Sequence, residues 1–119
     1  MECELKNVKN PILEIDTREI LDWQSFHAVF AEGLGFPHFY GQNMNAWVDC
    51  LTEIDNPEAK MTKITVPSGR LLVLQLQHAN DFAQRCPEIF QAMIESLAFV
   101  NWRRIEQGDE PILTISFFD

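Results

Sequence analysis

The groups in this chain that could perform nucleophilic chemistry are its histidines, together with Cys50 and Asp49. A cysteine beside a histidine that acts as base can attack an electrophile. Cys50, however, falls at the edge of an apolar helical stripe, where a thiol is usually unreactive. His27 lies in a predicted helix between Phe26 and Phe30, which indicates a structural role. We therefore predict that the chain has no catalytic residue and is not an enzyme.

Cofactor and metal chemistry also lacks its usual sequence patterns. No glycine-rich phosphate loop, G-x-S-x-G or H-E-x-x-H pattern occurs. The cysteines are Cys3, Cys50 and Cys86, which are odd in number, far apart and not arranged as C-x-x-C. This spacing argues against a zinc cage and a disulfide framework, and it favours reduced thiols in a cytoplasmic protein. We predict no metal and no cofactor.

A second function that the sequence allows is binding to another protein. A helix predicted from Asn43 to Glu53 has an apolar stripe made of Met44, Trp47, Val48 and Leu51. On its other side, polar residues recur at helical spacing: Asn45, Asp49, Thr52 and Glu53.

An aromatic loop precedes this helix. It contains Phe39 and Tyr40, is stiffened by Pro37, and has Gly41 where the backbone must turn tightly. A rigid aromatic loop beside a helix that carries carboxylates is what a protein-binding hot spot needs. The same two aromatic residues fit core positions equally well, and the pattern leaves both interpretations open.

The net charge indicates which partner such a surface would attract. The 119 residues include 18 Asp and Glu against 9 Lys and Arg, a formal charge of −9. Direct binding to nucleic acid or to an anionic membrane is disfavoured, because both need clustered cations. No Lys or Arg occurs between Arg18 and Lys60, a segment that holds seven of the acids. This segment is either a solvated face or a surface for a basic protein.

The elements that must position these residues follow from hydrophobic periodicity and capping signals. Strands are predicted over 11–16, 71–76 and 112–118, and helices over 22–34, 43–53, 80–85 and 87–106. Asp22, Asn43 and Asn80 are the expected N-caps, and Pro87 fits the first turn of the longest helix. Residues 56–69 have loop chemistry, in which 63–66 fits a short edge strand.

This order of elements predicts an α/β fold. Strands that alternate with pairs of helices are typical of a parallel sheet, here three strands and about four helices in one domain over residues 1–119. The nearly continuous apolar run of residues 71–76 predicts a strand covered on both faces. No secretion signal and no stretch of 18 apolar residues occurs, which favours the cytoplasm.

The run from Phe39 to Thr52, FYGQNMNAWVDCLT, resembles the barstar family of intracellular ribonuclease inhibitors. Tyr40, Gly41, Asn43 and the sequence Asp-Cys-Leu-Thr all fall in register with the family pattern. Residues 11–37 align without a gap, so the resemblance covers about half of the chain. It implies a barstar-like sheet, and a monomeric protein that binds a basic ribonuclease or nuclease toxin and blocks its active site.

The resemblance also implies which residues contact the partner. Asp49 would stand in for an RNA phosphate, and the remaining contacts would come from the loop and the helix face. The partner-binding set is Phe39, Tyr40, Gly41, Asn43, Asn45, Val48, Asp49, Thr52 and Glu53.

Departures from the family pattern keep a second hypothesis open. Asn45 stands where the family often has a second Asp, and Val48 stands where it has an exposed aromatic residue. Near the end of the long helix, Arg103 and Arg104 occupy the region of a family acid. Two cations there would repel a basic enzyme. The alternative is a barstar-like interaction protein that has lost ribonuclease inhibition and binds another basic protein.

Overall fold

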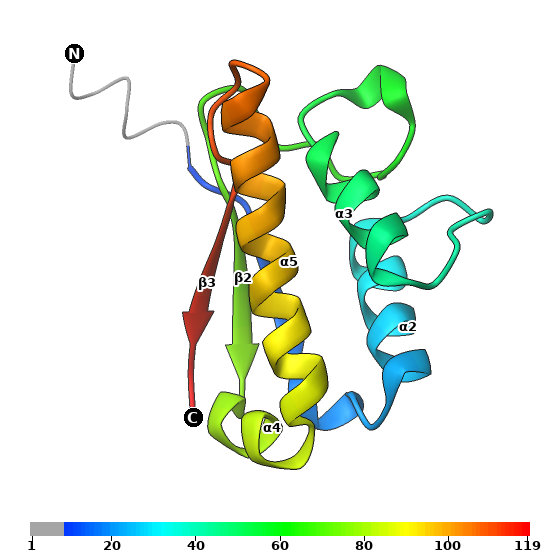
Figure 1. Ribbon diagram of the computed structural model, residues 1–119, viewed down its shortest axis with the longest axis vertical. Coiled ribbons are helices and arrows are strands. Elements are labelled where there is room, and N and C mark those ends of the chain that lie inside the picture. Colours follow the sequence, from blue (N-terminus) through cyan, green and yellow to red (C-terminus); the bar gives the residue numbers. More distant parts are fainter. Residues whose placement is uncertain (1–8) are drawn as a thin grey trace.

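The computed structural model describes residues 9–119, so Cys3 lies outside the described residues. Its strands are β1 (Ile12–Asp16), β2 (Leu72–Gln77) and β3 (Leu113–Phe117). Its helices are α2 (Trp23–Leu34), α3 (Met44–Thr52), α4 (Ala79–Arg85) and α5 (Pro87–Glu106), with short 3₁₀ turns η1 (Thr17–Glu19) and η2 (Pro57–Ala59). The predicted α/β order of strands and helix pairs is confirmed (Figure 1).

The three strands form one parallel sheet in the order β1-β2-β3. Ile12 pairs with Val73, and Leu72 pairs with Leu113. Parallel neighbours need a crossover connection. Helices α2 and α3 lie in the first crossover, and α4 and α5 lie in the second. The aromatic loop and α3 therefore belong to the crossover that joins an edge strand to the central strand.

Only one face of the sheet is fully covered. In β2 the side chains of Leu72, Leu74 and Leu76 are at most 1% exposed. The alternating residues Val73 and Gln75 are only partly buried. Helix α5 lies in front of the sheet in Figure 1. The prediction of a strand covered on both faces is wrong, because the residues that alternate with these leucines keep part of their surface in solvent. The apolar run did not reveal this, since Val73 continues it on the open face.

An aromatic cluster fixes α3 on α2. Phe26 and Phe30 of α2 are fully buried, with ring centroids 4.8 Å apart. Trp47 of α3 meets the Phe30 ring edge to face at 5.5 Å. Aromatic pairs in this geometry add to the stabilisation from buried area. Because these contacts attach the apolar stripe of α3 to α2, the opposite side of α3 faces solvent.

The N-caps predicted for α2 and α3, the helices on either side of the aromatic loop, are confirmed. The Asp22 side chain accepts a hydrogen bond from the Ser25 backbone N–H at 2.8 Å, and Asn43 accepts one from Ala46 at 2.8 Å. Pro87 begins α5, as predicted. The prediction for Asn80 is wrong: α4 begins at Ala79, after His78 in the left-handed conformation (φ 58°) without a side-chain cap.

The segment after α3 is a loop, as predicted, but residues 63–66 form no strand. Lys63 N–H donates instead to the carbonyl of Leu34, the last residue of α2, at 3.0 Å, and Val66 N–H donates to the carbonyl of Ile54, in the turn after α3, at 3.0 Å. Gly35 ends α2 with φ 68°, and a Cβ there would lie 2.6 Å from the Lys63 side chain. The segment thus ties the end of α2 to the end of α3.

Candidate functional site

The solvent face of α3 and its C-cap residue carry a row of three exposed side chains, Asn45, Asp49 and the C-cap Glu53, which we call the α3 polar row. Residues four apart on a helix lie one above the other, so the row runs along the whole helix. The Asp49 side chain, in the middle, is 58% exposed. The row presents one amide and two carboxylates to a binding partner.

Two other predicted contact residues on α3 are buried. The Thr52 hydroxyl donates to the Val48 carbonyl at 2.7 Å, and both side chains are 6% exposed. The prediction that Thr52 shares the exposed face is wrong, because the end of α5 covers it: Arg104 donates to the Thr52 carbonyl at 2.8 Å. Val48 lies under the polar row, where it packs between α3 and α5.

The two aromatic residues of the loop have different environments. Phe39 is 67% exposed, whereas Tyr40 is partly buried against Phe36, with ring centroids 4.7 Å apart. The Tyr40 hydroxyl lies 2.6 Å from Nδ1 of His27, a buried residue of α2. Each of the two interpretations therefore holds for one residue: Phe39 is a surface aromatic and Tyr40 is a packing residue.

Gly41 and Asn43 shape the loop from within. Asn43 caps α3, and its Nδ2 donates to the Gly41 carbonyl at 3.4 Å. A Cβ on Gly41 would lie 3.3 Å from that same nitrogen, so a larger residue would press on the cap. The left-handed residue of the turn is Gln42, with φ 54°. Both predicted residues thus fix the loop geometry.

Burial shifts the pKa values of the groups beneath the site. Burial lowers the pKa of His27 below its ordinary value, and burial together with the neighbouring Cys50 raises the pKa of Tyr40 above its ordinary value. Burial, and then the charge of Asp49, raise the pKa of the Cys50 thiol to about 11. A protonated thiol is a poor nucleophile. These groups therefore act as neutral structural residues at neutral pH.

Asp49 is not free of cations in this structure. Arg103 of α5 donates to its carboxylate at 3.0 Å, and the guanidinium carbon of Arg103 lies 5.2 Å from the centre of the Phe99 ring. Between α3 and α5 is a groove of about 550 Å³, which we call the α3–α5 groove. Its lining residues are Met44, Asn45, Val48, Asp49, Glu95, Ser96, Phe99 and Arg103.

The neighbouring arginine has a different role. Arg104 is 6% exposed and forms two hydrogen bonds to the Asp55 carboxylate, at 2.9 and 3.1 Å. It also donates to the carbonyls of Thr52 and Glu110, each at 2.8 Å. Each of the two cations is paired with an acid, Arg103 with Asp49 and Arg104 with Asp55, so neither is an isolated charge. Their partners lie 54 and 49 residues away in the chain, so no local pattern could have revealed them.

The segment of residues 56–69 lies close to the aromatic loop. A hollow of about 480 Å³ separates the two, with Pro37 and His38 on the loop side and Lys60 and Lys63 on the other. This segment places two of the few lysines next to the loop that carries Phe39.

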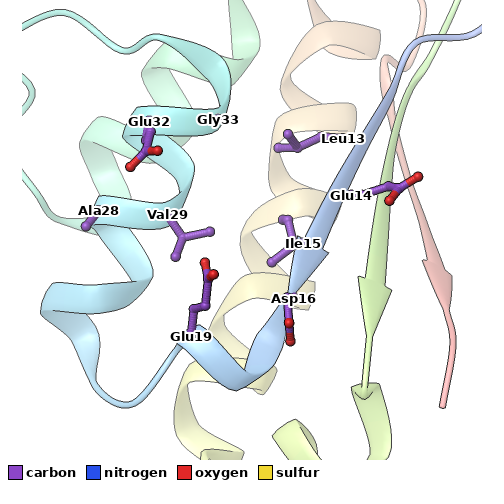
Figure 2. A pocket seen from close by; sticks show the side chains of 9 residues that line it. All are labelled: Leu13, Glu14, Ile15, Asp16, Glu19, Ala28, Val29, Glu32 and Gly33. Carbon is purple, nitrogen blue, oxygen red and sulfur yellow. The ribbon is translucent and has the colours of Figure 1, made fainter.

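Another hollow, of about 250 Å³, lies away from this surface, between β1 and α2. In Figure 2, Ile15 and Val29 face each other across it, and Glu19 lies beside Val29. Asp16 at its edge pairs with Arg18 at 2.7 Å. Within residues 9–119 there is no group of three histidine, cysteine or acidic side chains placed to hold a metal ion.

Comparison with known protein families matches residues 10–115 to Barstar (barnase inhibitor). The chain belongs to the barstar family. The match extends from the residues before β1 into β3, well beyond the half of the chain that carried the resemblance. A search of curated proteins finds no match to this sequence. The three-stranded parallel sheet and four helices are those expected of a barstar-like fold.

The family description concerns binding proteins rather than enzymes, since it names an inhibitor. In this barstar-family chain, the residues of the α3 polar row and Phe39 are exposed. None of the helices in the described part of the chain is long and apolar enough to span a membrane.

Proposed function

We propose that this protein is an inhibitor, or immunity protein, that binds a basic ribonuclease or nuclease toxin and covers its active site with the α3 polar row and the Phe39 loop. The observation that carries this proposal is the exposed Asp49 carboxylate on α3, a helix that directly follows the loop with the exposed Phe39. A carboxylate at this position can replace an RNA phosphate among the cations of such an enzyme. The family description supports this role.

Two groups of residues have separate tasks in this proposal. Phe39, Asn45, Asp49 and Glu53 contact the enzyme directly, because their side chains are exposed. Tyr40, Val48 and Thr52 support the loop and helix from below, and the exposed Gly41 and Asn43 fix the shape of the loop. Large aromatic side chains and desolvated charges account for most of the binding energy in such interfaces. We expect Phe39 and Asp49 to dominate the affinity.

The proposed inhibitor acts as a monomer in the cytoplasm. The described cysteines, Cys50 and Cys86, are free thiols, which supports a reducing compartment.

Two assays test the proposal. They measure whether this protein inhibits RNA cleavage by barnase, and whether it inhibits a nuclease whose gene lies next to its own. Asp49→Ala should weaken inhibition by about 2–5 kcal/mol, because the enzyme's buried cations lose their counter-charge. Glu32→Ala is the matched control, since it removes an exposed acid of α2 outside the site. Equal inhibition by the parent protein and by Asp49→Ala would contradict the proposal.

The ion pair between Asp49 and Arg103 favours one alternative, a barstar-like protein that binds a basic protein without inhibiting a ribonuclease. An internal cation on Asp49, with Asn45 in place of a further acid, makes this surface less negative. Capture of partners on the immobilised protein separates the two proposals. A partner that is released by Asp49→Ala but cleaves no RNA would favour the alternative.

A further inference from the structure

We infer that the solvent face of α5 carries an arginine-binding site, made of Phe99 and Trp102 with Glu95 and Glu106 on either side. The site would accept an arginine side chain of the basic partner and so extend the interface beyond α3. The nature of the partner rests on the proposed function. The binding chemistry of the site does not depend on it.

An exposed aromatic pair is the core of the site. Phe99 and Trp102 are 43% and 55% exposed, and their rings stack with centroids 5.7 Å apart and an angle of 29° between the planes. The opposite side of the same helix is the buried one, with Met93 and Val100 fully enclosed. The pair is therefore not needed to attach α5 to the core.

Acids lie on both sides of the aromatic pair. Residues 95, 99, 102 and 106 recur at spacings of four, three and four, which places them along one stripe of the helix. Glu95 and Glu106 are both exposed. A flat aromatic surface between two carboxylates suits a guanidinium group, which stacks through its plane and hydrogen-bonds through its edges. An ammonium group has no plane to stack, so arginine is preferred to lysine.

The molecule already contains this contact in part. The guanidinium of Arg103 lies over the Phe99 ring at 5.2 Å while it pairs with Asp49. Phe99, Glu95 and Asp49 also line the same α3–α5 groove, so the site adjoins the α3 surface through Phe99 and Glu95. A second copy of this chain would bring −9 against −9, whereas a basic protein has the complementary charge.

Titration with two short peptides, acetyl-Arg-Arg-amide and acetyl-Lys-Lys-amide, tests the inference by nuclear magnetic resonance. The observed signal is the indole N–H of Trp102, with the indole of the partly exposed Trp23 as an internal reference. We expect the arginine peptide to shift the Trp102 signal and to bind roughly two- to fivefold more tightly than the lysine peptide.

Three variants separate the contributions. Trp102→Leu keeps an apolar side chain but should abolish the preference for arginine at the remaining site, observed at Phe99. The double variant E95Q/E106Q should weaken the binding of both peptides and keep the preference for arginine over lysine. Phe118→Leu, at a similarly exposed aromatic residue outside α5, should change nothing.

Equal binding of the two peptides, or equal shifts at Trp23 and Trp102, would overturn the inference. Asp49→Ala makes its failure distinguishable from failure of the proposed function. That variant should lose ribonuclease inhibition and still show the arginine-dependent shift of Trp102. Loss of inhibition without any shift at Trp102 would leave the proposed function standing and remove the site on α5.

Discussion

The ion pair of Asp49 with Arg103 competes with the proposed interaction of Asp49 with an enzyme. In the unbound chain its carboxylate accepts a hydrogen bond from Arg103, and the two side chains are 58% and 34% exposed. An ion pair with this exposure is worth at most about 1 kcal/mol. A cation buried in an interface interacts more strongly with its partner. We therefore expect a bound enzyme to displace Arg103 from Asp49 at little cost.

Arg103→Gln tests this competition. Removing the internal cation should speed association with a basic ribonuclease, because the α3 polar row becomes more negative. The free energy of unfolding should change by less than about 1 kcal/mol, since the pair is exposed. Stopped-flow association and urea unfolding measure the two quantities. Slower association would show instead that Arg103 itself contacts the enzyme.

His27 makes stability depend on pH. Burial lowers its pKa in the folded chain, whereas in the unfolded chain the value returns to about 6.5. The unfolded chain therefore binds the proton first as pH falls. Stability from neutral His27 is complete above about pH 6.5 and is lost as pH falls through the folded-state pKa.

Urea unfolding at pH 7.5 and 5.5 measures this effect. His27→Gln is the control. The glutamine amide oxygen can accept a hydrogen bond from the Tyr40 hydroxyl, and the amide does not titrate. The variant should show a smaller loss of stability between the two pH values. An equal loss in both proteins would assign the pH dependence to other groups.

At the scale of elements, Arg104 joins the ends of α3 and α5. It bonds to the Asp55 carboxylate and to two backbone carbonyls from a nearly buried position. Arg104→Met should destabilise the fold by roughly 2–4 kcal/mol, because it leaves these acceptors without a donor. Urea unfolding measures the loss, with Arg103→Gln as a matched arginine one position earlier. Similar small losses in both variants would contradict this role.

The sequence was most informative where structure depends on neighbouring residues. Asp22 and Asn43 cap helices through bonds to residues three positions ahead, so their roles follow from local spacing. The three strands likewise follow from short apolar runs. The elements to which the site belongs were therefore predictable.

Features that depend on distant residues were not predictable. The pairing of Asp49 with Arg103 joins residues 54 positions apart. Thr52 has the helical spacing of an exposed residue, but the end of α5 covers it. Of the two aromatic residues in the loop, Tyr40 packs on α2 and Phe39 is exposed, and only the contact with α2 distinguishes them. In each case the decisive contact comes from another element.

At the scale of the whole molecule, the charge of −9 should control the rate of binding. Raising the salt concentration from about 0.01 to about 0.15 M shortens the screening length from about 30 to about 8 Å. We expect association with a basic nuclease to slow by at least about tenfold, while dissociation changes little. Stopped-flow measurements over this salt range provide the check. A salt-independent association rate would contradict electrostatic steering.

Parallel pairing of β1 with β2 also has a consequence for the folding rate. Residue 12 pairs with residue 73, and residue 72 pairs with residue 113, so neither strand pair is local. Folds dominated by such distant pairings fold slowly, because long loops must close before contacts reward them. The aromatic loop that carries Phe39, and helix α3, lie in the chain segment that connects β1 to β2. We therefore expect a newly made chain to complete its fold slowly, and for the proposed inhibitor the folding rate would limit how soon protection against a nuclease can begin.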